Sequence, residues 1–398
     1  MTYDVTELRS RFPALAEGAA HFDAPGGTQV PVEVARAVAD AMTAATANRG
    51  TSTRAERRAD AVVLAARAAM ADLLGADPRG VVFGRSATQL TVDLARTLAK
   101  EWRRGDEVVV SRLDHDANIR PWIIAAETVG ARVRWADFDP ATGELAPDDV
   151  ARVLSGRTRV VAVTAASNLI GTRPDVSSIS DLAHDAGALV AVDGVHATAH
   201  TGTDVTALGA DFYLCSPYKF LGPHLGVLAA SPERLETLRP DKLAPSTDAV
   251  PERMELGTLP YELLAGVTAT VDVIAGLAPA APTRRERVLT AMAMVERHED
   301  ALRERIEVGL RDLGGVTLYS RAARRTPTLL LRMDDVPDAS VRSALAARGV
   351  NAPNGSFYAV EASRHLGLGD DGAVRVGLAP YTDDTDVDRL LAALAAVR

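Results

Sequence analysis

The segment RVVAVTAASNLIGTRPDVSSISDLAHDAGALVAVD, residues 159–193, decides the fold of this chain. It begins with the apolar, β-branched run RVVAVTAAS (159–167), continues through the amphipathic stretch VSSISDLAHDAG (176–187) and ends in the apolar run ALVAVD (188–193). Two apolar strands separated by a helix imply neighbouring parallel strands whose sheet is covered by helices on both faces.

The same alternation extends in both directions from this segment. Further strands are expected at VVFG (81–84), EVVVS (107–111), RVRWADF (132–138), DFYLCS (211–216) and LGVLAA (225–230), with helical stretches such as TQLTVDLARTLAKEW (88–102) between them. The pattern predicts an α/β fold with a mostly parallel, seven-stranded sheet between helices. Ligands of such sheets bind beyond the carboxyl ends of the strands.

A change of pattern near residue 276 predicts a second domain. The Pro- and Ala-rich stretch GLAPAAPTRRER (276–287) precedes a long helical pattern over 288–313, which ends at Gly314–Gly315. Shorter strands, VTLYS, TLLLRM and VRVGL, and an amphipathic helix beginning at Thr382 or Asp383 follow. We therefore expect an N-terminal segment (1–20) packed with the small domain, a large domain (21–276) and a smaller C-terminal α+β domain (277–398).

Composition narrows the class of protein. The 398 residues are 47% hydrophobic with a net charge of −9, which argues against nucleic acid or an anionic membrane as a partner. No apolar run approaches the ~18 residues that a membrane span needs, and the N-terminus does not resemble a signal peptide, so a cytoplasmic enzyme is expected. The single cysteine, Cys215, excludes an intrachain disulfide, and no histidine pair has metal-ligand spacing, so no metal site is expected.

Lysine usage singles out one residue. Only Lys100, Lys219 and Lys242 occur among 44 basic residues, and Lys219 alone lies in an apolar segment, CSPYKFLGPHLG (215–226). The structural alternative is a buried stem that brings its ammonium to the surface. Unlike arginine, however, lysine can lose its proton and form an imine.

Polar residues follow several of the predicted strands. Asp193 ends ALVAVD, where it either caps a helix or serves as a carboxylate that keeps a pyridine nitrogen protonated. Ser86, Ala87 and Thr88 follow VVFG and open a helix, an arrangement suited to a phosphate group as well as to simple capping. Ser216 adds a hydroxyl three residues before Lys219.

Seven segments in order resemble the class V aminotransferases, in the cysteine desulfurase and selenocysteine lyase branch of the fold-type I enzymes that use pyridoxal 5′-phosphate (PLP). The segments are FGRSATQL (83–90), RLDHDANIRPW (112–122), TAASNLIGT (164–172), VAVDGVHATAH (190–200), CSPYKFLGPHLG (215–226), ELGTLP (255–260) and VRVGLAPY (374–381). The resemblance implies the fold-type I fold, PLP as the cofactor, an amino-acid substrate and a homodimer with shared active sites.

The resemblance also implies roles for individual residues. Lys219 would form the Schiff base with PLP and move the α-proton of the substrate, Asp193 would pair with the pyridine nitrogen, and His115 would stack on the ring. The remaining cofactor contacts would come from Ala87, Thr88, Asn168, His196, Ser216 and Tyr218, and from Thr258, which would reach the phosphate bound by the neighbouring subunit. Asn168 and Arg375 would bind the substrate carboxylate, and Ser356 and Tyr358 would contact the rest of the substrate.

Three positions depart from the family pattern. His196 stands where the desulfurases have a glutamine near the phenolic oxygen of the cofactor, and histidine can change its charge near neutral pH. Tyr218 replaces the histidine before the Schiff-base lysine and cannot be the same proton donor near pH 7. Asp116 replaces the second of two adjacent histidines and places a negative charge beside His115.

The largest departure is the missing nucleophile. Desulfurases carry a cysteine on a loop before the carboxylate-binding arginine, whereas the corresponding stretch here, NAPNGSFYAVEASRHLGL (351–368), has none. Cys215 precedes Lys219 on the strand that approaches the cofactor, so it cannot replace that cysteine, and Ser356 lacks an evident base. We therefore expect a C–S lyase that acts by β-elimination without a persulfide cysteine. The alternatives are an aminotransferase, an epimerase or a decarboxylating deaminase of the same fold, and, from another class, a non-catalytic dimeric scaffold.

Overall fold

The computed structural model describes residues 3–397 and contains the predicted seven-stranded sheet. Its strand order is β2 (Val81–Gly84), β8 (Gly226–Ala229), β7 (Phe212–Cys215), β6 (Leu189–Asp193), β5 (Thr158–Thr164), β3 (Glu107–Ser111) and β4 (Arg132–Ala136). Strands β7, β6, β5, β3 and β4 pair in parallel, and only β8 runs antiparallel to its neighbours β7 and β2. The α/β, mostly parallel fold predicted from the sequence is confirmed.

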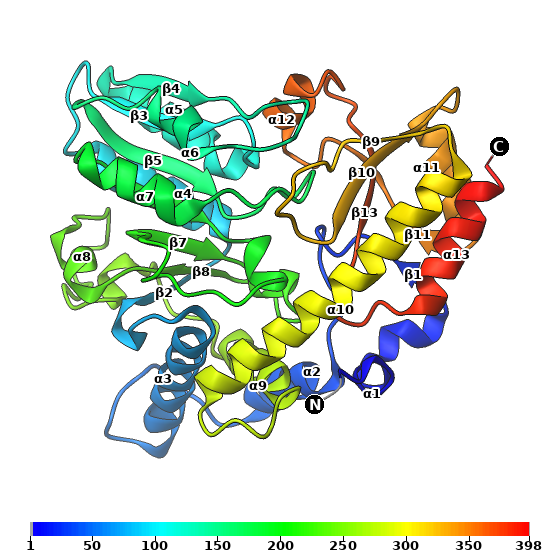
Figure 1. Cartoon of the computed structure of the whole chain (residues 1–398). Helices are drawn as coiled ribbons and strands as arrows, with labels where there is room; N and C mark the ends of the chain where they lie inside the picture. Colours follow the sequence, from blue (N-terminus) through cyan, green and yellow to red (C-terminus); the bar gives the residue numbers. More distant parts are fainter. Residues whose placement is uncertain (1–2, 398) are drawn as a thin grey trace.

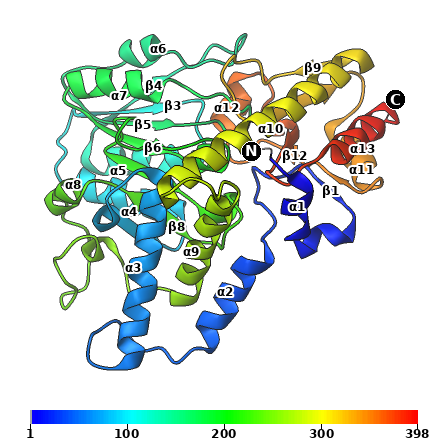
Figure 2. The ribbon, with the colours of Figure 1, turned by 60° about the horizontal axis from the view of Figure 1, so that its bottom comes forward.

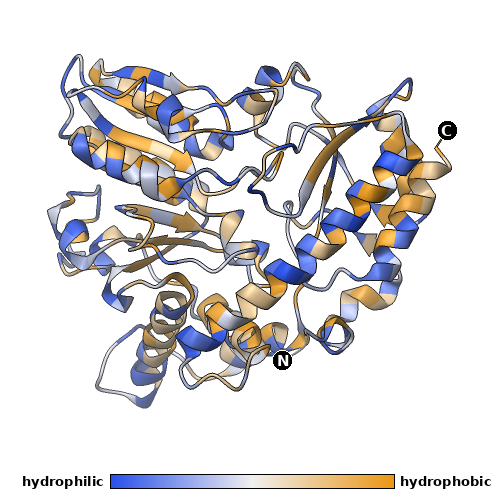
Figure 3. Cartoon of the chain, viewed as in Figure 1, coloured by the Kyte–Doolittle hydropathy of each residue, from blue (hydrophilic) through white to orange (hydrophobic). Residues whose placement is uncertain are grey.

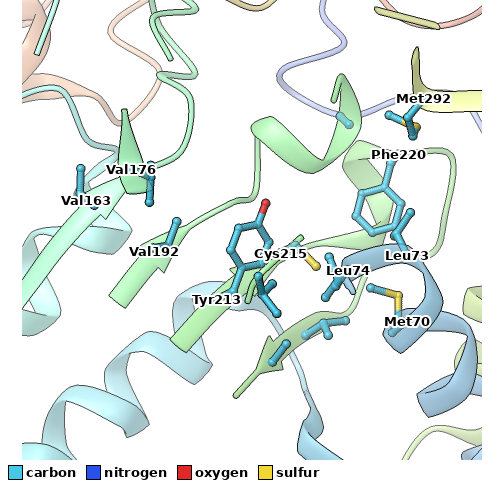
Figure 4. Close-up of a cluster of buried hydrophobic side chains, with 14 of the residues drawn as sticks. Met70, Leu73, Leu74, Val163, Val176, Val192, Tyr213, Cys215, Phe220 and Met292 are labelled. Carbon is cyan, nitrogen blue, oxygen red and sulfur yellow. The ribbon is translucent and has the colours of Figure 1, made fainter. Parts of the chain in front are cut away.

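Alternate residues of the central strands enter two separate cores. In β5, Val161 and Val163 face a core that includes helices α3 (Arg54–Leu74), α7 (Val176–Asp185) and α9 (Tyr261–Gly276). Their neighbours Val160 and Ala162 face the other core, beside α4 (Ala87–Ala99) and α5 (Arg120–Val129). Because side chains alternate along a strand, an apolar run is what a sheet covered on both faces requires. Figure 3 shows the resulting apolar strands, and Figure 4 shows Val163, Val192, Tyr213 and Cys215 within the first core.

The C-terminal part of the chain forms a four-stranded antiparallel sheet, with the order β12 (Asn354–Gly355), β13 (Ala373–Gly377), β10 (Thr328–Met333) and β9 (Val316–Leu318). Helices α11 (Asp338–Ala346) and α13 (Asp384–Ala395) pack with it around a third core. Asp383 is the N-cap of α13 and forms a capping box with Asp386, in agreement with the helix start expected at residues 382–383.

One long helix, α10 (Arg284–Leu313), joins these cores. Its first half contributes Val288 and Met292 to the core of the seven-stranded sheet, and its second half contributes Ile306 and Leu310 to that of the small sheet. Figure 1 shows α10 running diagonally from beside α9 to the small sheet, with α13 beside its second half. The small sheet is therefore held against the large one by a continuous helix as well as by loops.

The N-terminal segment lies against the C-terminal elements. Strand β1 (Ala20–His21) pairs in parallel with β11 (Val350–Asn351), and Arg9 of α1 (Val5–Ser10) forms an ion pair of 2.6 Å with Asp386. Helix α2 (Val32–Thr43) then crosses to α9, as Figure 2 shows. The domain boundaries at residues 20 and 276 stay a prediction. The remaining helices are α6 (Pro147–Ala151), α8 (Pro232–Thr237) and α12 (Val360–His365), and no helix within residues 3–397 combines the length and apolar character of a membrane span.

Candidate active site

A cavity of about 1090 Å³ opens at the carboxyl ends of the parallel strands. It collects residues that directly follow or end β2, β3, β5, β6 and β7, together with loop residues that precede β13. Eleven of the residues predicted from the sequence line it: Ala87, Thr88, His115, Asn168, Asp193, His196, Ser216, Tyr218, Lys219, Tyr358 and Arg375. Because they come from separate strands, the topology of the sheet brings them together.

One end of the cavity is formed by the start of α4. Ser86 is the N-cap, and its Oγ accepts a hydrogen bond of 3.1 Å from the backbone N–H of Gln89. The first backbone N–H groups of a helix have no partner within it, and the helix dipole favours an anion there. Gly226 of β8 lies directly against this turn, because a Cβ at that position would come within 2.2 Å of the Ser86 carbonyl carbon. A phosphate group suits this end of the cavity.

Lys219 lies on the far side, directly after β7. Its Nζ donates a hydrogen bond to the Pro25 carbonyl oxygen and lies 4.7 Å from the centre of the Tyr218 ring. Burial and, to a smaller extent, the charge of Arg375 lower the pKa of Lys219 to about 8, although Asp23 and Asp193 oppose the shift. A substantial neutral fraction near physiological pH is what imine formation requires.

Asp193 is buried and His115 is half-buried in the lining of the same cavity. The Asp193 carboxylate accepts a hydrogen bond of 2.9 Å from the Val195 N–H, and burial raises its pKa to about 6. Burial, aided by the charges of Lys219 and Arg375, lowers the pKa of His115 to about 4, so its ring is neutral at pH 7. The His115 Nδ1 accepts a bond of 3.0 Å from the Ala117 N–H, which fixes the orientation of the ring.

His196 and Tyr218, two of the departures from the family pattern, also reach the cavity. The His196 Nε2 lies 2.9 Å from Thr326 Oγ1 and 3.0 Å from Thr328 Oγ1, and burial holds the pKa of this histidine well below its usual value. The Tyr218 ring stacks on that of His224, with 4.6 Å between the ring centres. A contact of either residue with the cofactor stays a prediction.

Arg375 is 2% exposed and has its own partners on three sides. It donates from Nη2 to Asp23 Oδ1 at 2.7 Å and from Nη1 to the Asn168 carbonyl oxygen at 3.1 Å. Its Cζ lies 3.6 Å from the centre of the Phe357 ring. The neighbouring carboxylate of Asp23 compensates a buried charge that would otherwise be costly.

Two predicted residues do not line the cavity of their own chain. Ser356 is half-buried between β12 and Phe357, and Thr258 is exposed on the loop before α9. The role of Thr258 was predicted for a neighbouring subunit, so its position in a single chain leaves that prediction open.

Asp23 and Pro25 also line the cavity and are not among the residues predicted from the sequence. Asp23 and Pro25 lie in the stretch HFDAPGG near the N-terminus, and Asp23 meets Arg375 across 352 positions of sequence. The Asp-Ala-Pro-Gly-Gly composition marks a turn, but no periodicity connects it to the C-terminal strand.

These residues fit PLP. A buried carboxylate, an amine of lowered pKa, a neutral imidazole and a helix start are the groups that a pyridine nitrogen, an aldehyde, an aromatic ring and a phosphate require. Fold and site thus define an enzyme of the PLP-dependent class.

Comparisons with known proteins agree with the assignment to the PLP-dependent enzymes. The family model described as aminotransferase class-V matches residues 20–390. An uncharacterised protein of Mycobacterium tuberculosis is 36% identical, and a cysteine desulfurase of Klebsiella pneumoniae is 31% identical over 100% of this chain and 99% of its own length. The alignment with the M. tuberculosis protein covers 100% of this chain and 100% of that protein. The crystal structure of the cysteine desulfurase CsdA from Escherichia coli, 27% identical, superposes with a TM-score of 0.88 over 100% of this chain and 99% of its own.

The chain belongs to the class-V aminotransferase family. It is accordingly a PLP-dependent, cysteine desulfurase-like enzyme, as the sequence predicted.

Proposed function

We propose that this enzyme is a C–S lyase that acts by β-elimination on a cysteine-derived amino acid. The observation that carries the proposal is that the described part of the chain has no accessible cysteine thiol that could accept sulfur from a substrate. The loop 351–368 contains no cysteine, and Cys215, the single thiol of the chain, is fully buried among Met70, Leu74 and Phe220 (Figure 4). Burial raises the pKa of Cys215, so this thiol is neither ionised nor accessible.

PLP, when bound, supplies an electron sink for a carbanion at the substrate Cα. Lys219 holds the cofactor and then takes the α-proton, and its lowered pKa suits a base that works near neutral pH. Asp193 keeps the pyridine nitrogen protonated, and the neutral His115 ring stacks on the cofactor. The α4 start, with Ala87, Thr88 and Ser216, holds the phosphate.

Arg375 and Asn168 bind the α-carboxylate of the substrate. A guanidinium grips a carboxylate through two charge-assisted hydrogen bonds, and in the free protein the ring of Phe357 lies against this guanidinium. Ser356 and Tyr358 lie on the loop that faces the substrate side chain, and Tyr358 is 74% exposed at the mouth of the cavity. A homodimer in which Thr258 reaches the partner's phosphate is part of the proposal, as is a cytoplasmic location.

Loss of the α-proton is followed by departure of the thiol from Cβ. The remaining three-carbon enamine takes up water and gives pyruvate and ammonia, so no enzyme thiol is required. Reprotonation without loss of a leaving group would instead give transamination or epimerisation, and loss of carbon dioxide would mark a decarboxylating deaminase. A non-catalytic scaffold does not need the lowered Lys219 pKa or the buried Asp193 at one cavity.

Product analysis tests the proposal. The PLP-loaded protein is given cysteine, cystine and S-substituted cysteines, and pyruvate, ammonia and thiol are measured. We expect equal amounts of the three products from at least one substrate, and none from the Lys219→Ala protein. If pyruvate forms from none of them while a keto acid or a decarboxylated product forms from a larger amino acid, the lyase proposal is wrong.

A further inference from the structure

Phe357 contacts both side chains that we propose for the substrate α-carboxylate. The centre of its ring lies 3.6 Å from Cζ of Arg375, and its backbone carbonyl oxygen accepts a hydrogen bond of 3.0 Å from Nδ2 of Asn168. A carbonyl oxygen on this amide occupies the place of one carboxylate oxygen. One residue of the chain therefore engages both groups of the proposed carboxylate site.

Two further hydrogen-bonding groups of the proposed carboxylate site are buried without a partner among the described residues. Arg375 uses Nη1 and Nη2 for Asn168 and Asp23, whereas its Nε is buried and has no hydrogen-bond partner among the described residues. The Oδ1 atom of Asn168 is likewise buried and unpartnered within residues 3–397. A carboxylate binds an arginine side-on through two neighbouring N–H groups, so the free Nε is the donor it needs. Buried polar groups without partners are rare and call for a physical reason.

The backbone of this segment is held in an unfavourable conformation. Phe357 and Tyr358 have φ values of 52° and 61°, the left-handed region that bulky side chains rarely adopt. Two contacts of Tyr358 hold it there: its carbonyl oxygen accepts a bond of 2.8 Å from the Asp116 N–H, and its ring stacks on His115 at 5.4 Å. Strained residues persist only where surrounding contacts over-determine them, so losing these contacts favours a second arrangement.

We propose that Phe357 is a lid residue: its ring, stacked on the face of Arg375, holds its carbonyl oxygen on the Asn168 amide of the α-carboxylate site in the free enzyme, and both leave when a carboxylate binds. The inference rests on the proposed function, because it takes Arg375 and Asn168 as the carboxylate site. A ligand binds only the open fraction of such a protein, so its apparent affinity is lowered by that fraction. Phe357 thus sets how strongly the enzyme binds a carboxylate, and compounds without one leave the lid closed.

Propionate, a carboxylate without an amino group, is the probe. Its dissociation constant is measured on the PLP-loaded protein from the rise of Tm with propionate concentration and, independently, from the absorbance of the bound cofactor. In Phe357→Ala the ring that anchors the loop on Arg375 is absent, so the carbonyl oxygen leaves Asn168 more readily, and we expect propionate to bind at least about fivefold more tightly than to the wild type. A ring that merely lines the pocket predicts equal or weaker binding, and that result would overturn the proposal.

Three further variants complete the test. Arg364→Gln changes an exposed residue of α12 outside the cavity, and its affinity for propionate should stay within about twofold of the wild type. Phe357→Leu keeps an apolar side chain beside Arg375 but loses the aromatic face, so we expect an intermediate affinity, and it replaces Phe357→Ala if that protein does not fold. Arg375→Met should abolish the response.

The lid proposal and the lyase proposal are tested by independent measurements, propionate binding and product analysis. Tighter propionate binding without pyruvate formation would retain the lid and reject the lyase. Unchanged binding would reject the lid whatever the products are.

Discussion

The two sides of the active site are held in different ways. On the sheet side, Asp193, Ser216 and Lys219 follow directly from paired parallel strands and are largely buried. On the side of the small sheet, Phe357 and Tyr358 lie in a loop with positive φ, and Tyr358 is mostly exposed. Paired strands fix the first side, whereas the second is held by a few single contacts, such as the hydrogen bond from the Asp116 N–H to the Tyr358 carbonyl oxygen and the stacking of Phe357 on Arg375. We therefore expect the chemistry that needs fixed geometry to depend on the sheet side and substrate selection to depend on the loop side.

The largest expected effect is on the sheet side, at Lys219. Lys219→Ala removes both the anchor of the cofactor and the proposed base, and we expect kcat to fall by about 10³- to 10⁴-fold. Because Lys219 is a desolvated cation, its loss should not lower the Tm of the apoprotein. Turnover and calorimetry measure the two effects, and retained turnover would place the chemistry elsewhere.

On the same side, we expect Asp193→Asn to have opposite effects on turnover and on stability. We expect kcat to fall about 100-fold, because an amide does not hold the pyridine proton as a carboxylate does. Burial raises the pKa of Asp193 to about 6. The free energy of unfolding of the apoprotein therefore falls as the pH rises from about 4 to 6, and above pH 6 this loss of stability is complete. At pH 8 the apo variant should be roughly 1–3 kcal/mol more stable than the wild type. A lower Tm together with unchanged turnover would contradict this account.

On the loop side, effects should appear in substrate binding. Arg375→Lys keeps the charge but loses the bidentate fork, so we expect KM to rise about tenfold, with kcat changing by less than about threefold. Steady-state kinetics with the best substrate from product analysis provides the measurement. A large fall in kcat at constant KM would instead assign Arg375 to the chemical step.

The smallest expected effect is a pH dependence. In the proposed function the neutral amine of Lys219 captures the cofactor. Because burial lowers its pKa to about 8, the rate of PLP binding to the apoprotein should rise about tenfold from pH 6 to pH 7. Between pH 8 and pH 9 it should rise only about twofold, whereas an ordinary lysine would still give about tenfold. Stopped-flow absorbance measures this rate, and a tenfold rise from pH 8 to pH 9 would show an unperturbed lysine.

This contrast also explains how much the sequence could predict. Asp193 and Lys219 were found because strand ends and an apolar lysine leave local signals, and the seven strands followed from apolar runs. The role of Asp23 and the contact of Phe357 with Arg375 could not be predicted, for a physical reason. The Asp23–Arg375 ion pair joins residues 352 positions apart, and neither the positive φ of Phe357 nor its contact with Arg375 leaves a local pattern. The position of Thr258 depends on a second chain.

The most direct test of the central claim is the ratio of pyruvate to alanine formed from cysteine by the PLP-loaded enzyme and by its Cys215→Ala variant. β-Elimination gives pyruvate, ammonia and sulfide, whereas transfer of sulfur to an enzyme thiol gives alanine and a persulfide. We predict pyruvate without alanine, at the same rate in both proteins, because the buried Cys215 takes no part. Alanine from the wild type that disappears in Cys215→Ala would contradict the account and make this buried thiol the sulfur acceptor.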